Sequence, residues 1–413
     1  MNRRLFPPLA SHFSLLAFST SLLLLAFVGR SVAAEKSQSD PASAIAEIVQ
    51  KAIKADHLRA VIVKVTQGDK VVVSQAFGES MTGVPATTAM HFRNGAVAFS
   101  YLGTLLLQFV DQHKVKLDDT IERWMPTLPE ANKVTLKMLA NQTSGYPDFE
   151  TDPKFVAAFD RDPFHIFTFE ERLKIAFSRP MMFEPGTNWS YSHTNFMVLG
   201  EILSKIGGKP LDVLLREKVL GPMGLKNTTA TQTSEIPSPV LHAFDSERRA
   251  ALKIPADVAF TEESTFWNVQ WGTPMGANQT TNIDDMITTA VKVGTGALLS
   301  KSSYEAMTGP HLLGFGKKQD NCAPSCFTQV NGYNYGIGVV RSGSWLLQNP
   351  LLAGFGAVEA YLPSKKIAIA VAATFMPEAF DSQGNYANSS DTLFRQIGAY
   401  MAPDDAPPMP RKG

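Results

Sequence analysis

The sequence predicts a mixed α/β (α+β) protein with one antiparallel sheet formed from both chain ends. Three observations support this prediction. Strand-like runs lie near the start and in the last third of the chain, helix-period apolar patterns fill the middle, and turn signals join neighbouring strands. Because hairpin connections make antiparallel neighbours, we expect an antiparallel sheet flanked by helices, with an inserted helical lobe beside it.

The first strands are predicted in residues 59–80. Two β-rich runs flank the turn "QGD", which is a hairpin signal. Val63 and Val65 alternate with polar residues in the first run, and Val71 and Val73 are spaced in the same way in the second. This alternation predicts that the four valines lie on one buried face.

Helices are predicted before these strands and through the middle of the chain. The segments whose apolar residues recur at helical spacing are 44–56, 101–115, 168–178, 197–207 and 280–293. Asn282 or Thr281 would cap the last of them, and Gly207-Gly208 would end the one before. The helical lobe would span about 91–299.

Strands return in the last third of the chain. They are predicted at 333–343, 356–363 and 366–375, followed by an amphipathic helix over 389–401. The sheet lobe would therefore comprise about 45–90 and 300–400. Residues 401–413 are predicted to be a disordered tail, because they are rich in proline and charge.

The N-terminus has the order of a secretory signal peptide. A basic start, a long apolar stretch and small residues before Ala34 predict a signal at 1–34, followed by a polar linker at 35–44. A retained anchor helix is the competing interpretation. No second stretch reaches the roughly 20 apolar residues of a membrane span, so we expect a secreted or periplasmic protein.

Composition excludes some classes of partner. The 413 residues carry no formal net charge, with a pI near 7.1, which gives no reason to expect nucleic acid as a partner. Cys322 and Cys326 are the two cysteines, and they would form a small disulfide loop or remain two thiols. No metal or cofactor pattern stands beside them.

Several segments together resemble the serine β-lactamase and penicillin-binding-protein superfamily, in its class C β-lactamase, D,D-peptidase and esterase branch. The segments that resemble this branch are "FRNGAV", "LLLQFVDQHKVKLDDTIERWMP", "VTLKMLANQTSGYPDF", "FEPGTNWSYSHTNFMVLGEIL", "LLREKVLGPMGLKNT" and "GFGAVEAYLPSKKIAIAV". The resemblance implies one related domain over 45–400. It also implies an active site between a sheet lobe and a helical lobe, built by three motifs.

The first motif of the family, S-x-x-K at the start of a helix, falls on Ala96-Val97-Ala98-Phe99. The chemistry needs a hydroxyl that attacks a carbonyl and an amine one helical turn away that activates it. Ala96 has no hydroxyl, and Phe99 accepts no proton. Both members of the activated pair are therefore missing.

The other two motifs are also altered. Y-x-N falls on Tyr191-Ser192-His193, where a tyrosine with a lowered pKa could transfer protons and His193 replaces the asparagine. The K/H-T/S-G triplet falls on Gln348-Asn349-Pro350, which lacks the basic residue and the glycine. Proline is tolerated only at a strand start, edge or bulge.

Other serines could in principle replace the nucleophile. Ser100 lies one helical turn after Ala96, Ser192 precedes His193, and Ser144 lies in a loop. Ser100 has no evident base, and helix serines usually bond the local backbone. Neighbouring loop residues such as Ser192 and His193 seldom point at each other, and the loop of Ser144 resembles a structural loop of the family. Neither a G-x-S-x-G elbow nor an H-E-x-x-H metal motif occurs.

Two functions follow from these motifs. The first is an exported, non-catalytic relative that binds a small ligand or cell-wall-like peptide in the cleft between the lobes. The residues expected at that cleft are Ala96, Phe99, Ser100, Tyr191, His193, Gln348 and Asn349. The alternative is a hydrolase of the esterase, β-lactamase or D,D-carboxypeptidase kind, with Tyr191 and His193 as an acid–base pair. A surface-binding role is a third possibility, and the sequence predicts no oligomeric state.

Overall fold

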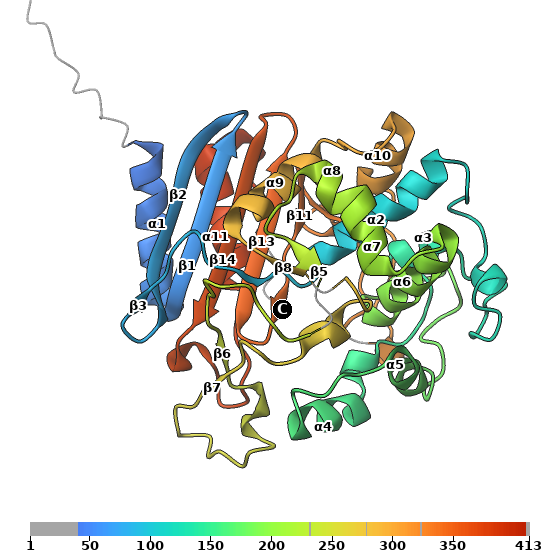
Figure 1. The fold of residues 1–413 in the computed structure, drawn as a ribbon, viewed down its shortest axis with the longest axis horizontal. Coiled ribbons are helices and arrows are strands. Elements are labelled where there is room, and N and C mark those ends of the chain that lie inside the picture. Colours follow the sequence, from blue (N-terminus) through green and yellow to red (C-terminus); the bar gives the residue numbers. More distant parts are fainter. Residues whose placement is uncertain (1–39, 231–232, 278, 323, 410–413) are drawn as a thin grey trace, which may run out of the picture. The chain divides into compact units, whose positions relative to one another are not determined.

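The computed structural model of the protein describes residues 40–230, 233–277, 279–322 and 324–409 (Figure 1). The predicted signal peptide at 1–34 and the first part of the predicted linker lie outside the described residues. Helix α1 begins at Pro41, so the last residues assigned to that linker are helical. Proline suits this position because the first turn of a helix needs no backbone N–H donor.

The chain ends meet in one antiparallel sheet, as the sequence predicts. Within the described residues this sheet has nine strands in the order β3-β2-β1-β14-β13-β11-β10-β9, with β12 paired to β13. The main strands are β1 (Leu58–Gln67), β2 (Lys70–Met81), β3 (Val84–Pro85), β9 (Asn334–Tyr335), β10 (Val340–Ser342), β11 (Trp345–Gln348), β12 (Leu351–Leu352), β13 (Phe355–Leu362) and β14 (Ile367–Phe375). The pairing that joins the two ends of the chain is β1 with β14, where Val63 lies opposite Val371.

The hairpin at "QGD" forms, but one part of its predicted alternation is wrong. Val65 of β1 pairs with Val73, and the next residue, Thr66, pairs with Val71, so β2 contains a bulge at Val72. Because of this extra residue, the β2 side chains before the bulge point to the opposite face of the sheet from the one that simple alternation predicts. Val73 is therefore buried, whereas Val71 is 51% exposed.

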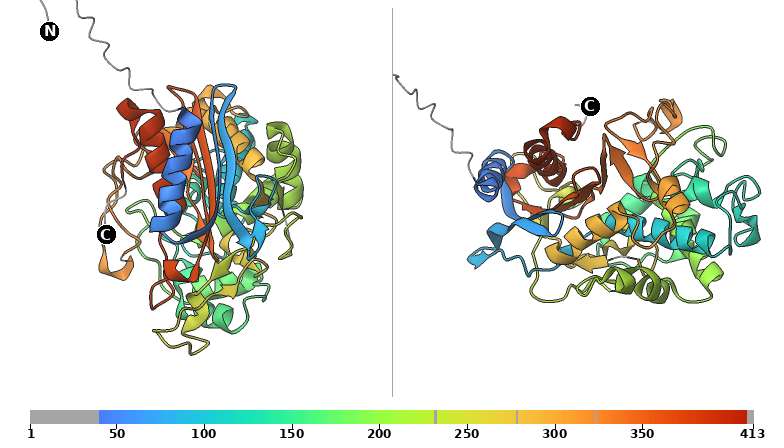
Figure 2. Two further views of the ribbon diagram at one scale, coloured as in Figure 1. Left: turned by 90° about the vertical axis from the view of Figure 1, so that its left-hand side faces the viewer. Right: turned by 90° about the horizontal axis from the view of Figure 1, so that it is seen from above.

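Helices cover both faces of the sheet. Helices α1 and α11 pack on one face, and α9 with the rest of the helical segment lies on the other (Figure 2). The α-helices are α1 (Pro41–Ala55), α2 (Val97–Asp111), α3 (Leu136–Ala140), α4 (Pro153–Arg161), α5 (Phe169–Ala176), α6 (His193–Gly207), α7 (Leu211–Leu215), α8 (Gly221–Met223), α9 (Ile283–Gly294), α10 (Lys301–Thr308) and α11 (Ser389–Met401). Strands β13 and β14 are buried along their whole length, because helices exclude water from both of their faces.

Short strands complete the helical segment. They are β4 (Phe92–Arg93), β5 (Thr229–Ala230), β6 (Phe244–Asp245), β7 (Glu262–Glu263) and β8 (Gln279–Thr281). Asn282 caps α9 by accepting a hydrogen bond from the backbone of Asp285. None of the helices in the described part of the chain is long and apolar enough to cross a membrane.

The prediction of a disordered tail over 401–413 is wrong for residues 401–409. Met401 closes α11, and Pro403–Asp405 form a 3-10 turn. The buried Trp345 Nε1 donates to the carbonyl oxygen of Asp405 at 2.7 Å, and Arg395 donates to that of Pro408. These buried donors need acceptors, and the tail supplies them. Residues 410–413 lie outside the described part.

Glu359 in the core should make stability depend on pH. It lies on β13 opposite Gln348, and burial raises the pKa of Glu359 well above the ordinary value of 4.5. The folded protein therefore keeps a proton that the unfolded chain loses. Above about pH 4.5 the free energy of unfolding should fall by up to about 1.4 kcal/mol per pH unit. Urea unfolding at several pH values measures this slope, which Glu359→Gln should flatten.

The exposed Glu378 provides the matched control. Glu378→Gln should leave the pH dependence of unfolding as it is in the parent protein. Equal slopes for Glu359→Gln and the parent protein would contradict the assignment.

Candidate active-site cavity

The three altered motifs meet at one cavity of about 490 Å³. Ala96 comes from the start of α2, Tyr191 and His193 from the start of α6, and Gln348 and Asn349 from the end of β11. The other lining residues are Gly95, Glu150, Glu247, Val269, Trp271, Gly272, Thr273, Tyr333, Pro350, Leu351, Leu352, Ala353 and Tyr386. The structure thus brings together five of the seven cleft residues that the sequence predicts.

The start of α2 presents a methyl group at the position where the resemblance predicts a nucleophile. Ala96 is partly exposed and lines the cavity. Phe99, three residues on, is fully buried and stacks on Phe196 with ring centroids 3.9 Å apart and planes 4° apart. Its ring belongs to the core behind the cavity, 6.2 Å from the ring of Tyr191. The position of the activating amine is therefore filled by an aromatic contact.

The expectation that Ser100 lies at the cleft is contradicted. Its hydroxyl is buried and donates to the carbonyl oxygen of Val97 at 2.8 Å, as a helix serine commonly does. Ser144 is also buried and donates to Asn195 Oδ1, and Ser192 is fully buried. None of the three serines lines the cavity.

The third motif approaches α2 closely. A Cβ atom on Gly95, whose φ is +44°, would lie 2.8 Å from Cβ of Pro350, so glycine is needed at this approach. Gln348 Nε2 donates to the carbonyl oxygen of Gly338 at 2.8 Å, and Asn349 Nδ2 donates to Asp391 Oδ1 at 3.1 Å. Both amides thus have protein partners, and Pro350 lies between the end of β11 and the start of β12, outside both strands.

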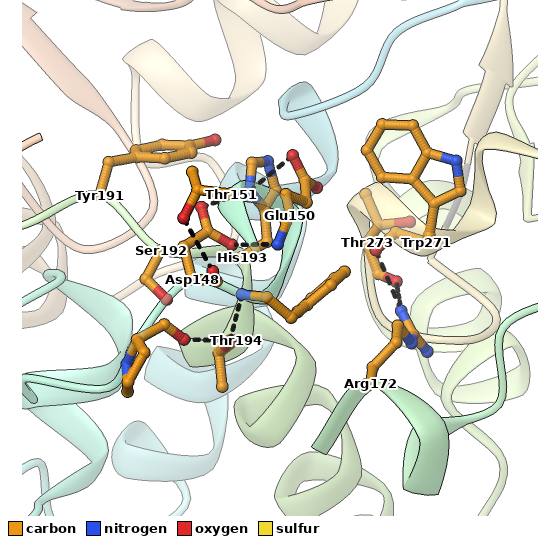
Figure 3. Close-up of polar contacts among 12 residues, drawn as sticks. Asp148, Glu150, Thr151, Arg172, Tyr191, Ser192, His193, Thr194, Trp271 and Thr273 are labelled. Carbon is orange, nitrogen blue, oxygen red and sulfur yellow. Dashed lines mark hydrogen bonds and ion pairs between the residues drawn. The ribbon is translucent and has the colours of Figure 1, made fainter. Parts of the chain in front are cut away.

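His193 lies between two carboxylates (Figure 3). Its Nδ1 is 3.0 Å from Asp148 Oδ2 and 3.0 Å from Glu150 Oε2. Burial by itself would lower the pKa of His193, but the charges of Glu150 and Asp148 and the hydrogen bond that the ring donates to Asp148 raise it to about 9. Where both carboxylates are ionised, the ring is therefore an imidazolium.

Glu150 is perturbed in the same cluster. Burial raises the pKa of Glu150, the charge of His193 opposes this rise and that of Asp148 adds to it, and the resulting pKa is about 8. Burial also raises the pKa of Tyr191 well above 10, with Tyr335 and Tyr333 adding to the rise. The phenol therefore keeps its proton, which is the opposite of the lowered pKa that proton abstraction by Tyr191 requires.

Local hydrogen bonds fix this cluster. Asp148 accepts a hydrogen bond from the backbone N–H of Glu150 and so begins the 3-10 turn Phe149–Thr151. Thr194, in the first turn of α6, donates to the carbonyl oxygen of Pro147 at 2.6 Å. The loop and the helix are thus joined beside the cavity (Figure 3).

Sequence reasoning missed Asp148, Glu150, Glu247 and Trp271. The one local signal was "PDFE", where two acidic residues alternate after a turn. The sequence predicts no metal site, yet donor atoms of Asp148, Glu150 and His193 lie within 4.8 Å of one another, close enough to share a divalent ion. The ion pairs to His193 account for this closeness without a metal.

Arg172 supports the facing wall of the cavity. Its guanidinium is buried and donates to the carbonyl oxygens of Trp271 at 3.1 Å and Thr273 at 2.9 Å (Figure 3). These bonds hold a segment that has no regular strand partners. The buried guanidinium of Arg172, from α5, thereby holds the backbone of the segment whose Trp271 side chain lines the cavity.

The predicted disulfide between Cys322 and Cys326 is present. Cys326 also forms an isolated antiparallel bridge with Ser190, directly before Tyr191. The disulfide loop therefore packs against the segment that carries the second motif, which gives it a bracing role and no chemical one.

The two carboxylates around His193 should be visible in its titration. We expect the His193 ring to titrate near pH 9 by NMR. Glu150→Gln should lower that pKa by about one unit or more, because one of two attractive charges is lost.

The raised pKa also means that protonated His193 stabilises the fold fully below about pH 6.5, and that this stability is lost as the pH rises through about 9.

Glu201, which is on the same helix and pairs with Lys205, provides the control. Glu201→Gln should leave the titration of His193 in place. An unchanged pKa of His193 in Glu150→Gln would contradict the assigned contact.

Comparisons with known proteins identify the family of this chain. A family model described as beta-lactamase matches residues 45–393. D-alanyl-D-alanine-carboxypeptidase/endopeptidase AmpH of Escherichia coli K12 is 31% identical over 136 residues, which are 32% of this chain and 34% of that protein. Penicillin-binding protein 4 of Amycolatopsis lactamdurans is 30% identical over 151 residues, 35% and 37% of the two chains. The matched segment therefore spans only about a third of these relatives.

Solved structures show the same fold over a larger share of the chain. D-amino acid amidase from Ochrobactrum anthropi SV3, in complex with D-phenylalanine, has a TM-score of 0.71 and 22% identity, with 87% of this chain and 98% of that chain covered. The octameric penicillin-binding protein homologue from Pyrococcus abyssi has a TM-score of 0.68 and 18% identity, with 89% and 79% covered. With its family match over most of its length and this shared fold, the chain belongs to the beta-lactamase family.

Proposed function

We propose that this protein is an exported, non-catalytic member of its family that binds a small ligand or cell-wall-like peptide in the cavity. The observation that supports this most strongly is the methyl group of Ala96 beside the buried ring of Phe99. Acyl-enzyme formation in this family needs a hydroxyl and an amine at these two positions. A protein without them retains at most the residual rate that comes from binding and oxyanion stabilisation.

The rest of the cavity wall supports the same proposal. Among the described residues that line it, none is a serine, a cysteine or a lysine. A volume of about 490 Å³ lies within the range of small-molecule sites. Its walls combine aromatic rings with amides and carboxylates, which suits recognition of an organic ligand. Relatives named for action on D-alanyl-D-alanine make a cell-wall-like peptide a reasonable ligand class.

A second candidate is hydrolysis without a covalent intermediate. The observation that favours it is His193, held by Asp148 as catalytic imidazoles commonly are. Above about pH 9 the neutral ring would accept a proton from water, and Tyr191, which keeps its proton, would be the acid. Hydrolysis of a nitrophenyl ester that rises through pH 9 and is lost in His193→Asn, but not in Ser100→Ala, would favour this candidate.

Covalent labelling tests the leading proposal directly. The intact mass of the protein should not change after incubation with a penicillin or, separately, with a fluorophosphonate, because no activated nucleophile lines the cavity. Ala96→Ser/Phe99→Lys is the constructed positive control. Lysine at the buried Phe99 position loses the stacking on Phe196 and should lower the melting temperature, so Ala96→Ser alone is a second, better-folded comparison.

A stoichiometric adduct on the parent protein would overturn the proposal, and peptide mapping would then identify the nucleophile. An adduct on either variant alone would support a cavity that keeps its geometry without its chemistry.

A further inference from the structure

The cavity has an unequal set of charges. Two carboxylates line it, Glu150 before α4 and Glu247 in the 3-10 turn after β6. Within the part of the chain that the structure describes, no lysine or arginine lines it. The lining histidine, His193, is already engaged by Asp148 and Glu150. A ligand therefore meets two acidic groups and no free side-chain cation.

The charges behind the wall do not reverse this balance. The guanidinium of Arg172 is directed to backbone carbonyl oxygens, and Arg248 pairs with Glu262 at 2.9 Å. Asp245 is fully buried beneath Glu247 and accepts a hydrogen bond from its backbone N–H at 2.7 Å. Burial raises the pKa of Glu247 well above 4.5, and the charge of Asp245 raises it further, so Glu247 is a polar group of the cavity whose ionised form is disfavoured.

One carboxylate oxygen has no partner. Glu150 Oε2 contacts His193, whereas Glu150 Oε1 is buried without a hydrogen-bond partner among the described residues. A Cβ atom added to Gly272 would lie 3.7 Å from this oxygen, so the segment that presents Trp271 runs beside it. A buried acceptor without a donor is costly, and a ligand donor would relieve that cost.

Aromatic rings surround these acids. Trp271, Tyr191, Tyr333 and Tyr386 line the cavity, and Trp271 lies across from Glu150 in Figure 3. The faces of aromatic rings attract organic cations, and Trp does so most strongly. Carboxylates and aromatic rings together are the chemistry that recognises an ammonium group.

We infer that the cavity binds a ligand through an ammonium group placed between Glu150 Oε1 and the ring of Trp271. This inference rests on the proposed function and specifies its ligand class. A ligand that offers a carboxylate here would be repelled by Glu150 once Glu150 is ionised, and it would find no free side-chain cation to pair with. The altered motifs therefore accompany a change in the charge that the cavity accepts.

Three probes of matched shape test the inference: phenethylamine, phenethyl alcohol and phenylpropionate. Burial raises the pKa of Glu150 to about 8, so binding is measured by calorimetry at a pH clearly above 8, where the ionised form of Glu150 predominates. We expect the amine to bind at least about tenfold more tightly than the alcohol, and phenylpropionate to bind most weakly. Added salt should weaken the binding of the amine and not that of the alcohol.

Variants then locate the site. Glu150→Gln and Glu247→Gln should each reduce the preference for amine over alcohol, and Glu150→Gln should reduce it more. Glu247→Gln keeps the test valid if loss of Glu150 disturbs His193. The exposed Glu305 on α10, which pairs with Lys301 outside the cavity, provides the control, and Glu305→Gln should leave the preference unchanged.

The outcomes separate this inference from the proposed function. Equal binding of amine and alcohol, or a preference for phenylpropionate, would overturn the inference and leave ligand binding by the cavity intact. Absence of binding by all three probes at millimolar concentration would overturn it as well. An amine preference that survives both cavity substitutions would place the site elsewhere and so overturn it.

Discussion

The pairing of β1 with β14 is the constraint on which the rest of the structure depends. Ala60 to Gln67 run antiparallel to Ile367 to Thr374, so segments three hundred residues apart form the centre of the sheet. The chain segment between them must therefore leave the sheet and return to it. The cavity lies between the starts of two helices of this segment, α2 and α6, and the end of the sheet strand β11.

At the start of α2, an aromatic packing contact occupies the turn for which the resemblance predicts catalytic groups. In an active relative this turn would have to hold a hydroxyl and an amine in a polar setting. Here Phe99 stacks on Phe196, and both rings are buried in the hydrophobic core next to the cavity. Burial of an aromatic ring stabilises the fold, whereas a buried amine would cost free energy unless it were paired. The substitution is therefore compatible with a stable protein that lacks acyl-transfer chemistry.

The titratable groups of this cavity lie at other positions than the basic groups of the family's motifs. The family places its basic groups on α2 and on the third motif, and both positions are uncharged here. In their place, Asp148 and Glu150 hold His193, and Glu247 faces the same space from another loop. Burial raises the pKa of Glu150, and the neighbouring carboxylates raise the pKa of His193. Perturbed titration of this kind is common where a protein binds or transforms a ligand.

Local patterns in the sequence were sufficient to predict the main helices and strands and the absence of the first motif's serine and lysine. Periodicity identifies the hairpin of β1 and β2 and the strands β13 and β14, because side-chain alternation follows directly from burial. The identities of Ala96 and Phe99 already exclude the usual nucleophile and its base. Tertiary structure decided the rest, since it depends on contacts between distant residues. Only the folded chain brings Glu150 to His193 and places Glu247 on the wall of the same cavity. It also directs the hydroxyl of Ser100 to the backbone of its own helix and supplies Trp345 with a hydrogen-bond acceptor from the tail. Such contacts are set by loop paths and bulges, whose geometry is fixed by the packing around them and leaves no periodic trace in the sequence.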